Sequence, residues 1–337
     1  MNLAAGAADG AQLAGDSHPR LLRTPRSAWW RAVLGLMLAG ATVVFSAIAI
    51  IVVALLVSGA TGGSTDTEDA LDPDTALGLL ANNLVIATMI PAAVLAVLVV
   101  HQERIGWLAS VTARVRWRLL GLLLVLAALV VGVFFALGFL LPTSEPGTDI
   151  SVPAAGTLVG LLAVILLTTP LQAAAEEVGF RGYLTQAVSS WFARPAVGIG
   201  AGVAVSATCF ALAHGVQDAW LFGDRFAFGL VASWLAWRTG GLEAPVALHV
   251  MNNLVSLAFT ASTGSLEESL SVSTLEWQFA VLDVAMMLTF AFLVDRLVRR
   301  RPVVTRRVLS APEAVGYPGA RPPTPPPAGS EIPWGMG

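Results

Sequence analysis

The sequence predicts an all-α protein that crosses a membrane as a polytopic transmembrane helical bundle of about eight spans. Of its 337 residues, 56% are hydrophobic and only 12% are charged, and the mean hydropathy is +0.75. Soluble domains rarely have so few charges. In addition, apolar runs of about 20 residues, the length that crosses the hydrocarbon of a bilayer, recur along most of the chain. We therefore expect an integral protein of the plasma (inner) membrane, with membrane lipid around it.

The expected spans begin after a polar N-terminal segment. Residues 1–28 are rich in Ala and Gly, and we expect them to form a disordered tail that ends at a pair of interfacial tryptophans. The next run, 32–57, is too long for the core of a signal peptide and is expected to span the membrane. Further expected spans are 75–100, 119–141, 153–175, 197–213, 226–238, 244–262 and 277–298. The helical domain thus covers about 29–300, and the Pro-rich residues 301–337 are expected to form a second disordered tail.

Charge is distributed unevenly among the segments that connect the spans. Arginines gather in the N-terminal tail, in 101–118, in 176–196 and after the last span, whereas acidic residues gather in 59–74, 142–152 and 263–276. Positively charged segments tend to stay in the cytoplasm, so eight spans place both termini there. The net charge of −3 offers no basic face for a nucleic acid, and we expect no such partner.

Three short strings place ionisable or amide side chains in or beside these apolar spans. They are EEVGFRG at 176–182, FALAHG at 210–215 and HVMNN at 249–253. Ionisable groups at membrane depth are costly and usually functional. Because all three strings lie between spans four and seven, we expect them to form one common site there.

Helical spacing assigns different surroundings to the two glutamates of the first string. Residues four apart on a helix lie about 40° from each other, at about 100° per residue. Glu177 can therefore pair with Arg181, whereas Glu176 points about 100° away from Glu177 and is left available for chemistry. His249 and Asn253 have the same spacing, so one helix can present an imidazole and an amide to a single cavity.

A glutamate, two histidines and an asparagine suit the hydrolysis of a peptide bond. A carboxylate in a partly dehydrated cavity can act as a general base toward water, and a histidine can share that role. A second histidine and an amide can donate hydrogen bonds to the oxyanion of a tetrahedral intermediate. Glu176, His214 and His249 are also a common three-ligand shell for catalytic zinc, with a fourth position for water. The sequence leaves both mechanisms open, so no cofactor is certain and zinc is the candidate to test.

Signatures of other intramembrane hydrolases do not occur in the chain. There is no His-Glu-x-x-His helix, no Gly-x-Ser-Gly turn and no Gly-x-Gly-Asp string. Cys209 lies five residues before His214, about 140° around a helix, and is expected to be a small buried side chain rather than a nucleophile. Two alternatives without proteolysis remain. One is a scaffold or immunity-type protein that binds a membrane partner in the same cavity, and the other is a proton-coupled transporter.

Taken in order, the three strings resemble the signature of the CPBP family of intramembrane proteases. This family, also called the Abi family, includes the type II CAAX prenyl endopeptidases and bacteriocin-processing proteins. Its pattern is Glu-Glu-x-x-x-Arg, then Phe-x-x-x-His, then His-x-x-x-Asn/Asp, and about residues 150–262 match it without a departure. The resemblance implies an endopeptidase that hydrolyses a peptide bond of a membrane-associated protein or peptide.

The resemblance also implies a role for each residue of the strings. Glu176 would be the catalytic glutamate, and His214 would help it to activate water. His249 and Asn253 would stabilise the oxyanion. The supporting residues would be Glu177, Arg181 and Phe210.

The expected span boundaries conflict with one common site. Counting residues puts Glu176 and His249 near the cytoplasmic ends of spans four and seven, but it puts His214 at the far end of span five. For the three to meet, span five has to run past His214, or the helices have to be tilted or broken around a water-filled cavity.

Overall fold

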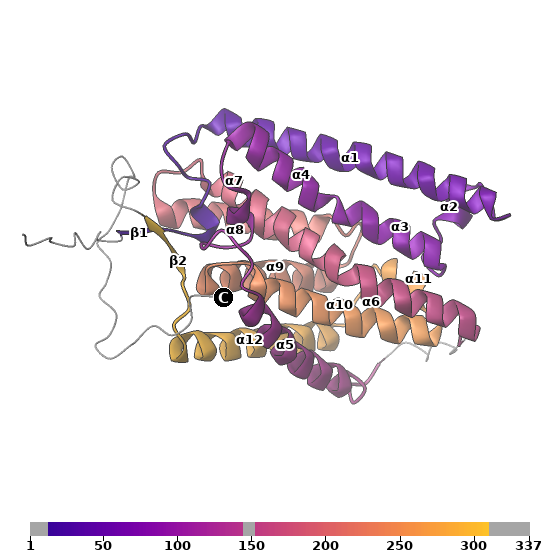
Figure 1. The fold of residues 1–337 in the computed structure, drawn as a ribbon. Helices are drawn as coiled ribbons and strands as arrows, with labels where there is room; N and C mark the ends of the chain where they lie inside the picture. The colour runs from indigo at the N-terminus through magenta and orange to yellow at the C-terminus, as the bar shows by residue number, and fades with distance from the viewer. Residues whose placement is uncertain (1–12, 144–151, 310–337) are drawn as a thin grey trace, which may run out of the picture.

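The computed structural model describes residues 13–143 and 152–309, and these form an all-α bundle with one small two-stranded sheet (Figure 1). Within the described residues, seven helical stretches are long and apolar enough to cross a membrane. The expected polytopic all-α fold is therefore confirmed. The seven stretches are Trp29–Ala60, Ala76–His101, Trp117–Gly138, Ala155–Ser189, Pro195–Leu212, Glu243–Thr263 and Trp277–Arg300.

Several of these stretches combine more than one element. In chain order the elements are β1 (Leu13–Ser17), η1 (His18–Arg20), α1 (Trp29–Ala60), α2 (Thr67–Ala70), α3 (Ala76–Ala87), α4 (Met89–Leu95), η2 (Ala96–His101), η3 (Ile105–Leu108), α5 (Trp117–Gly138), α6 (Ala155–Glu177), η4 (Val178–Leu184), α7 (Thr185–Ser189), α8 (Pro195–Leu212), α9 (Ala219–Thr239), α10 (Glu243–Thr263), α11 (Leu266–Leu270), α12 (Trp277–Arg300) and β2 (Arg306–Leu309).

Helix α9 carries the chain along the bundle once more, although it is not among the seven most apolar stretches. It starts well before the expected span 226–238, because Asp218 caps it by accepting a hydrogen bond from the Leu221 N–H at 2.8 Å. Asp224 and Arg225 lie in its second turn and interrupt the apolar pattern on which the expected start depended. The helix ends at Thr239, and the next residue, Gly240, has the left-handed conformation (φ 72°) that favours glycine.

The arginine-rich segments lie together at one end of the bundle. There, β1 pairs antiparallel with β2, and Ser110 pairs with Gly241, so both described ends of the chain and the loop 102–116 meet (Figure 1). Acidic residues meet elsewhere, where the Glu267 N–H donates to Asp74 Oδ1 at 3.0 Å. The membrane side on which the termini lie stays a prediction.

The expectation of a disordered N-terminal tail is wrong for residues 13–28, while 1–12 lie outside the described residues. This segment forms β1 and η1, and the last residue of η1 is the buried Arg20, whose guanidinium donates to the carbonyl oxygens of Phe192 at 3.2 Å and Ala193 at 3.4 Å. The Pro-rich tail also begins with an ordered strand, β2, and its residues 310–337 lie outside the described residues.

Acid is expected to loosen this N-terminal segment through His18. Its imidazole is fully buried, and Nε2–H donates to the Leu108 carbonyl oxygen at 3.1 Å, whereas Nδ1 has no hydrogen-bond partner within 13–143 and 152–309. Burial lowers the pKa of His18 to about 4, below its ordinary value of 6.5. The docked segment therefore holds a neutral imidazole, and its stability falls as the pH drops from 6.5 toward 4. Between pH 7 and pH 5 the loss is about 2 kcal/mol.

Hydrogen exchange of residues 13–27 at pH 7 and pH 5 measures this loss. The His18→Gln variant, which cannot take up a proton, is the control and should lose most of the pH dependence. Equal protection of the wild-type segment at both pH values would show that His18 is not buried in its neutral form.

Helices α6, η4 and α7 form one continuous helical run of 35 residues, Ala155–Ser189. The expected span ended at residue 175, but the helix continues past Glu176 and Glu177, which therefore lie inside the run. The turns of η4 are wider than those of an α-helix, and the carbonyl oxygen of Phe180 accepts from the Thr185 N–H and from the Thr185 and Ser206 hydroxyls, both at 2.9 Å. Wide turns of this kind often occur next to functional sites.

Candidate functional site

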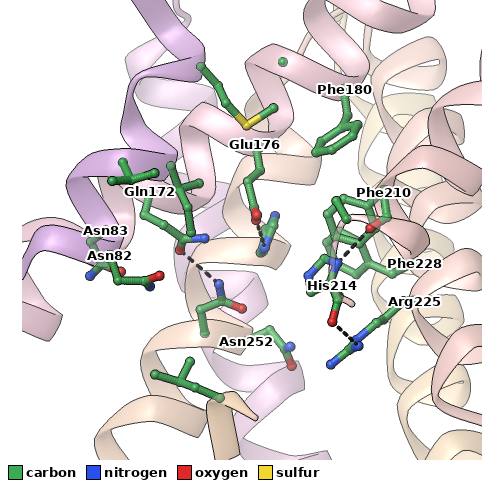
Figure 2. A pocket seen from close by; sticks show the side chains of 18 of the residues that line it. Asn82, Asn83, Gln172, Glu176, Phe180, Phe210, His214, Arg225, Phe228 and Asn252 are labelled. Atoms are coloured by element: carbon green, nitrogen blue, oxygen red, sulfur yellow. Dashed lines mark hydrogen bonds and ion pairs between the residues drawn. The ribbon is translucent and has the colours of Figure 1, made fainter. Parts of the chain in front are cut away.

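One cavity of about 1160 Å³ lies among the helices next to the two glutamates. Glu176, His214, His249 and Asn253 all line it, whereas Glu177 and Arg181 do not. Figure 2 shows Glu176 of α6 and His214, in the turn after α8, directed toward the same space. The structure thus brings the four expected catalytic side chains to one cavity.

The length of the run Ala155–Ser189 explains how His214 can approach Glu176. Helix α8 has only 18 residues, about half the length of that run, and the two lie antiparallel after the turn that joins them. The end of α8 therefore reaches the middle of the run rather than its start. His214 follows α8 directly, and the chain then turns away at Gly215, which has φ 84°.

Glu176 and Glu177 are both held by His249 of α10. The His249 Nε2 atom lies 3.1 Å from Glu176 Oε2, and Nδ1 lies 2.8 Å from Glu177 Oε1. The same Glu177 oxygen accepts from Arg181 Nη1 at 3.0 Å, as the four-residue spacing indicates. Glu177 therefore lies behind the cavity wall between two cations, and Glu176 presents its carboxylate to the cavity.

The charges of this cluster balance when His249 carries two protons. Two carboxylates then face one guanidinium and one imidazolium, and both imidazole nitrogens donate to carboxylate oxygens. Glu177 and Arg181 are almost fully buried, and His249 is 4% exposed. Because a buried unbalanced charge is costly, this arrangement favours ionised Glu176 at neutral pH.

Three phenylalanine rings enclose the guanidinium of Arg181. Its Cζ atom lies 4.3 Å from the ring centre of Phe210, 5.4 Å from that of Phe228 and 5.9 Å from that of Phe180. The Arg181 Nε and Nη2 atoms have no hydrogen-bond partner among the described residues, so the faces of the rings contribute cation–π contacts in place of further hydrogen bonds. Phe210 therefore supports the site by stacking on the arginine.

Phe210 also determines which nitrogen of His214 is free. The His214 Nδ1 atom lies 2.7 Å from the Phe210 carbonyl oxygen, which can only accept, so Nδ1 carries the proton. In the neutral ring, Nε2 then has a lone pair, and His214 lines the cavity. Arg225 steadies the following loop by donating to Gln217 Oε1 at 2.7 Å. His214 is therefore oriented as a proton acceptor.

The structure adds polar residues that the motif analysis missed. Gln172 is 7% exposed, lines the cavity and accepts a hydrogen bond from Asn253 Nδ2 at 3.2 Å. It lies one helical turn before Glu176, so helical spacing from the glutamate is a signal that could have found it. Asp224 and Asp283 also line the cavity, from α9 and α12, but neither belongs to a motif.

The arrangement does not present Glu176, His214 and His249 as a preformed zinc shell. Both His249 nitrogens are in contact with carboxylates, so a metal on Nε2 would have to displace Glu176. Among the described residues, a group of three acidic or histidine side chains whose ligand atoms all lie within 4.8 Å of one another occurs at Asp72, Asp74 and Glu267, not at the cavity. Asp72 and Asp74 lie in the loop before α3, and Glu267 lies in α11.

Comparison with known proteins agrees with the motif resemblance. Residues 158–255 match the family model described as Type II CAAX prenyl endopeptidase Rce1-like. The matched range contains all three strings and the four expected catalytic residues. No curated protein and no solved structure matches the chain. Residues 158–255 are thus similar to the domain of the Rce1-like type II CAAX prenyl endopeptidases, and this similarity supports a CAAX-protease-like intramembrane endopeptidase at the level of the family.

Proposed function

We propose that the protein hydrolyses a peptide bond with a water molecule activated by Glu176 and His214. The observation that carries this proposal is that a carboxylate and the lone pair of an imidazole line one cavity, each fixed by a hydrogen bond on its far side. Water bound between them would give a proton to Glu176 while its oxygen attacks the substrate carbonyl. The protonated carboxyl would then pass the proton to the leaving amine.

Asn253 is the proposed donor to the oxyanion. Its Nδ2 atom has two hydrogens, and only one is used in the bond to Gln172. The resemblance implied that His249 would share this role, but both of its nitrogens contact carboxylates. We propose instead that His249 orients Glu176 and balances its charge.

The proposed substrate is a protein or peptide with a membrane-associated segment. The cavity lies within a bundle of membrane-spanning helices, and its wall includes apolar residues of α1. The description of the matched family names CAAX prenyl endopeptidases, so a prenylated C-terminal peptide is one candidate substrate.

Comparative proteomics of membrane-protein termini tests this function and finds substrates at once. Cells with the wild-type protein are compared with cells that carry Glu176→Gln at the same abundance. We expect a set of new termini that depends on Glu176 and is also lost in His214→Ala. Identical termini in all three strains would contradict proteolysis and favour a scaffold or transporter.

We propose that the reaction needs no zinc, since the contacts of His249 leave no preformed metal shell. Protein purified without chelators is expected to hold far less than one zinc per chain by elemental analysis. A strong chelator is expected to leave the cleavage rate unchanged. Stoichiometric zinc whose removal abolishes cleavage would establish the metal-dependent mechanism instead.

A further inference from the structure

Side-chain carboxamides from three helices gather along one side of the cavity. They lie on α3, α6 and α10, close to Glu176 (Figure 2). The group consists of Asn82, Asn83, Gln172, Asn252 and Asn253. The catalytic proposal above uses only the last of these, so the role of the others is unassigned.

Asn83 has a structural role in the frame of the cavity. Its Nδ2 atom donates to the hydroxyls of Thr168 at 2.8 Å and Thr169 at 3.3 Å, and thereby ties α3 to α6. Its side chain is 2% exposed, so little of it can reach a ligand.

Gln172 and Asn253 form a carboxamide pair next to the reacting groups. Gln172 lies one turn before Glu176 on α6, and Asn253 lies one turn after His249 on α10. The bond from Asn253 Nδ2 to Gln172 Oε1 leaves the NH₂ group of Gln172 and the Oδ1 atom of Asn253 with no protein partner among the described residues. Both residues line the cavity, so the pair offers one donor group and one acceptor to its contents.

The backbone of a bound peptide substrate requires the same two kinds of group, a hydrogen-bond donor and a hydrogen-bond acceptor. Around the scissile bond the backbone has to be extended, and its N–H and C=O groups lose their water when the peptide enters the bundle. A polar group left without a partner there costs several kcal/mol in a low-dielectric surrounding, about 2–7 by transfer measurements. A donor and an acceptor on neighbouring carboxamides can replace that water for one peptide unit.

We propose that the Gln172–Asn253 pair binds the backbone of the substrate beside the scissile bond. Gln172 Nε2 donates to a substrate carbonyl oxygen, and Asn253 Oδ1 accepts from a substrate N–H. The second hydrogen of Asn253 Nδ2 stays available for the oxyanion. This inference rests on the proposed proteolysis, and it makes Gln172 a substrate-binding residue that recognises an extended backbone rather than a particular side chain.

The test uses a peptide taken from a Glu176-dependent terminus, and a series in which single amides on either side of the cleaved bond are replaced by esters. An ester lacks the N–H and is a weaker acceptor. With the full-length enzyme, one ester position is expected to raise KM about 10-fold, the effect of about 1.4 kcal/mol. Gln172→Leu is expected to raise KM for the all-amide peptide by a similar factor, with a smaller change in kcat.

The decisive measurement is the KM of the Gln172→Leu variant with the ester-containing peptide. If Gln172 contacts that backbone position, the ester has little further effect in Gln172→Leu, because the lost hydrogen bond is the same one. Gln186→Leu is the matched control. Gln186 is a buried glutamine of the same helical run that donates to the Trp107 carbonyl oxygen at 2.9 Å and does not line the cavity. It is expected to change thermal stability and to leave the ester effect intact.

The outcomes separate the two proposals. Cleavage that survives Glu176→Gln overturns the proposed function and with it this inference. Glu176-dependent cleavage with a wild-type KM in Gln172→Leu, or with additive effects of variant and ester, overturns the inference alone. If Gln172→Leu fails to fold, the ester series on the wild-type enzyme still tests the inference. A series in which no ester position raises KM contradicts recognition of the substrate backbone.

Discussion

Replacing Glu176 with glutamine is expected to lower kcat about 10²- to 10⁴-fold, the usual contribution of a general base. Glutamine is nearly the same size as glutamate, and its NH₂ group can donate to Nε2 of a neutral His249, the nitrogen that lies 3.1 Å from the carboxylate in the wild type. It cannot, however, take a proton from water. The measurement is single-turnover cleavage by purified protein in detergent, on a peptide identified from the membrane-protein termini.

Stability provides the control for this prediction. With glutamine at 176, a neutral His249 still leaves Glu177 and Arg181 as a balanced pair, so the melting temperature should change little. Glu176→Asp keeps the carboxylate but draws it back by one methylene, and an intermediate rate is expected. A variant Glu176→Gln that cleaves at the wild-type rate would assign the general base to another residue, with His214 as the next candidate.

Interactions within one helix were predictable from the sequence. The pair Glu177–Arg181 forms at 3.0 Å because a four-residue spacing returns to one face of the helix. The same argument separates Glu176 from Arg181, and in the structure Glu176 contacts His249 instead. Helical periodicity determines which residues of one helix share a face, independently of how the helices pack.

Helix boundaries beside the site were not predictable from hydropathy. The expected span stopped before Glu176 because an apolar run stops at charges. In the structure the helix continues through Glu177 and Arg181, since their charges neutralise each other inside the bundle. Helix α9 also starts earlier than expected, because the cavity accommodates Asp224 and Arg225. Charges that are balanced or face a cavity do not end a helix.

The folded N-terminal segment had no local signal at all. Composition favoured disorder, yet Arg20 and His18 are buried against carbonyl oxygens that lie far along the chain. Their partners are backbone carbonyl oxygens, that of Leu108 in η3 and those of Phe192 and Ala193 after α7, and backbone atoms have no residue pattern that a sequence can reveal. Gln172 is an intermediate case. Its position one turn before Glu176 can be read from the sequence, but its hydrogen-bond partner on α10 cannot.

The largest effect on stability is expected for Arg181→Leu. The variant removes the fully buried guanidinium and leaves the carboxylate of Glu177 with His249 as its one remaining cation. Breaking a buried pair by removing one partner costs about 3–5 kcal/mol, because the remaining charge stays without compensation. Thermal unfolding of the purified protein in detergent, together with its accumulation in the membrane, measures this loss.

A double variant separates the charge from the packing. Glu177→Gln combined with Arg181→Leu restores electrical balance and should recover most of the stability lost in Arg181→Leu. Arg181→Lys keeps the charge but not the planar group that stacks 4.3 Å from Phe210, so it should lie between wild type and Arg181→Leu. Arg238→Leu, at a partly exposed pair with Asp295, should cost little. If the double variant is no more stable than Arg181→Leu, the arginine acts through its contacts with the rings, and charge balance is not what keeps Glu177 buried behind Glu176.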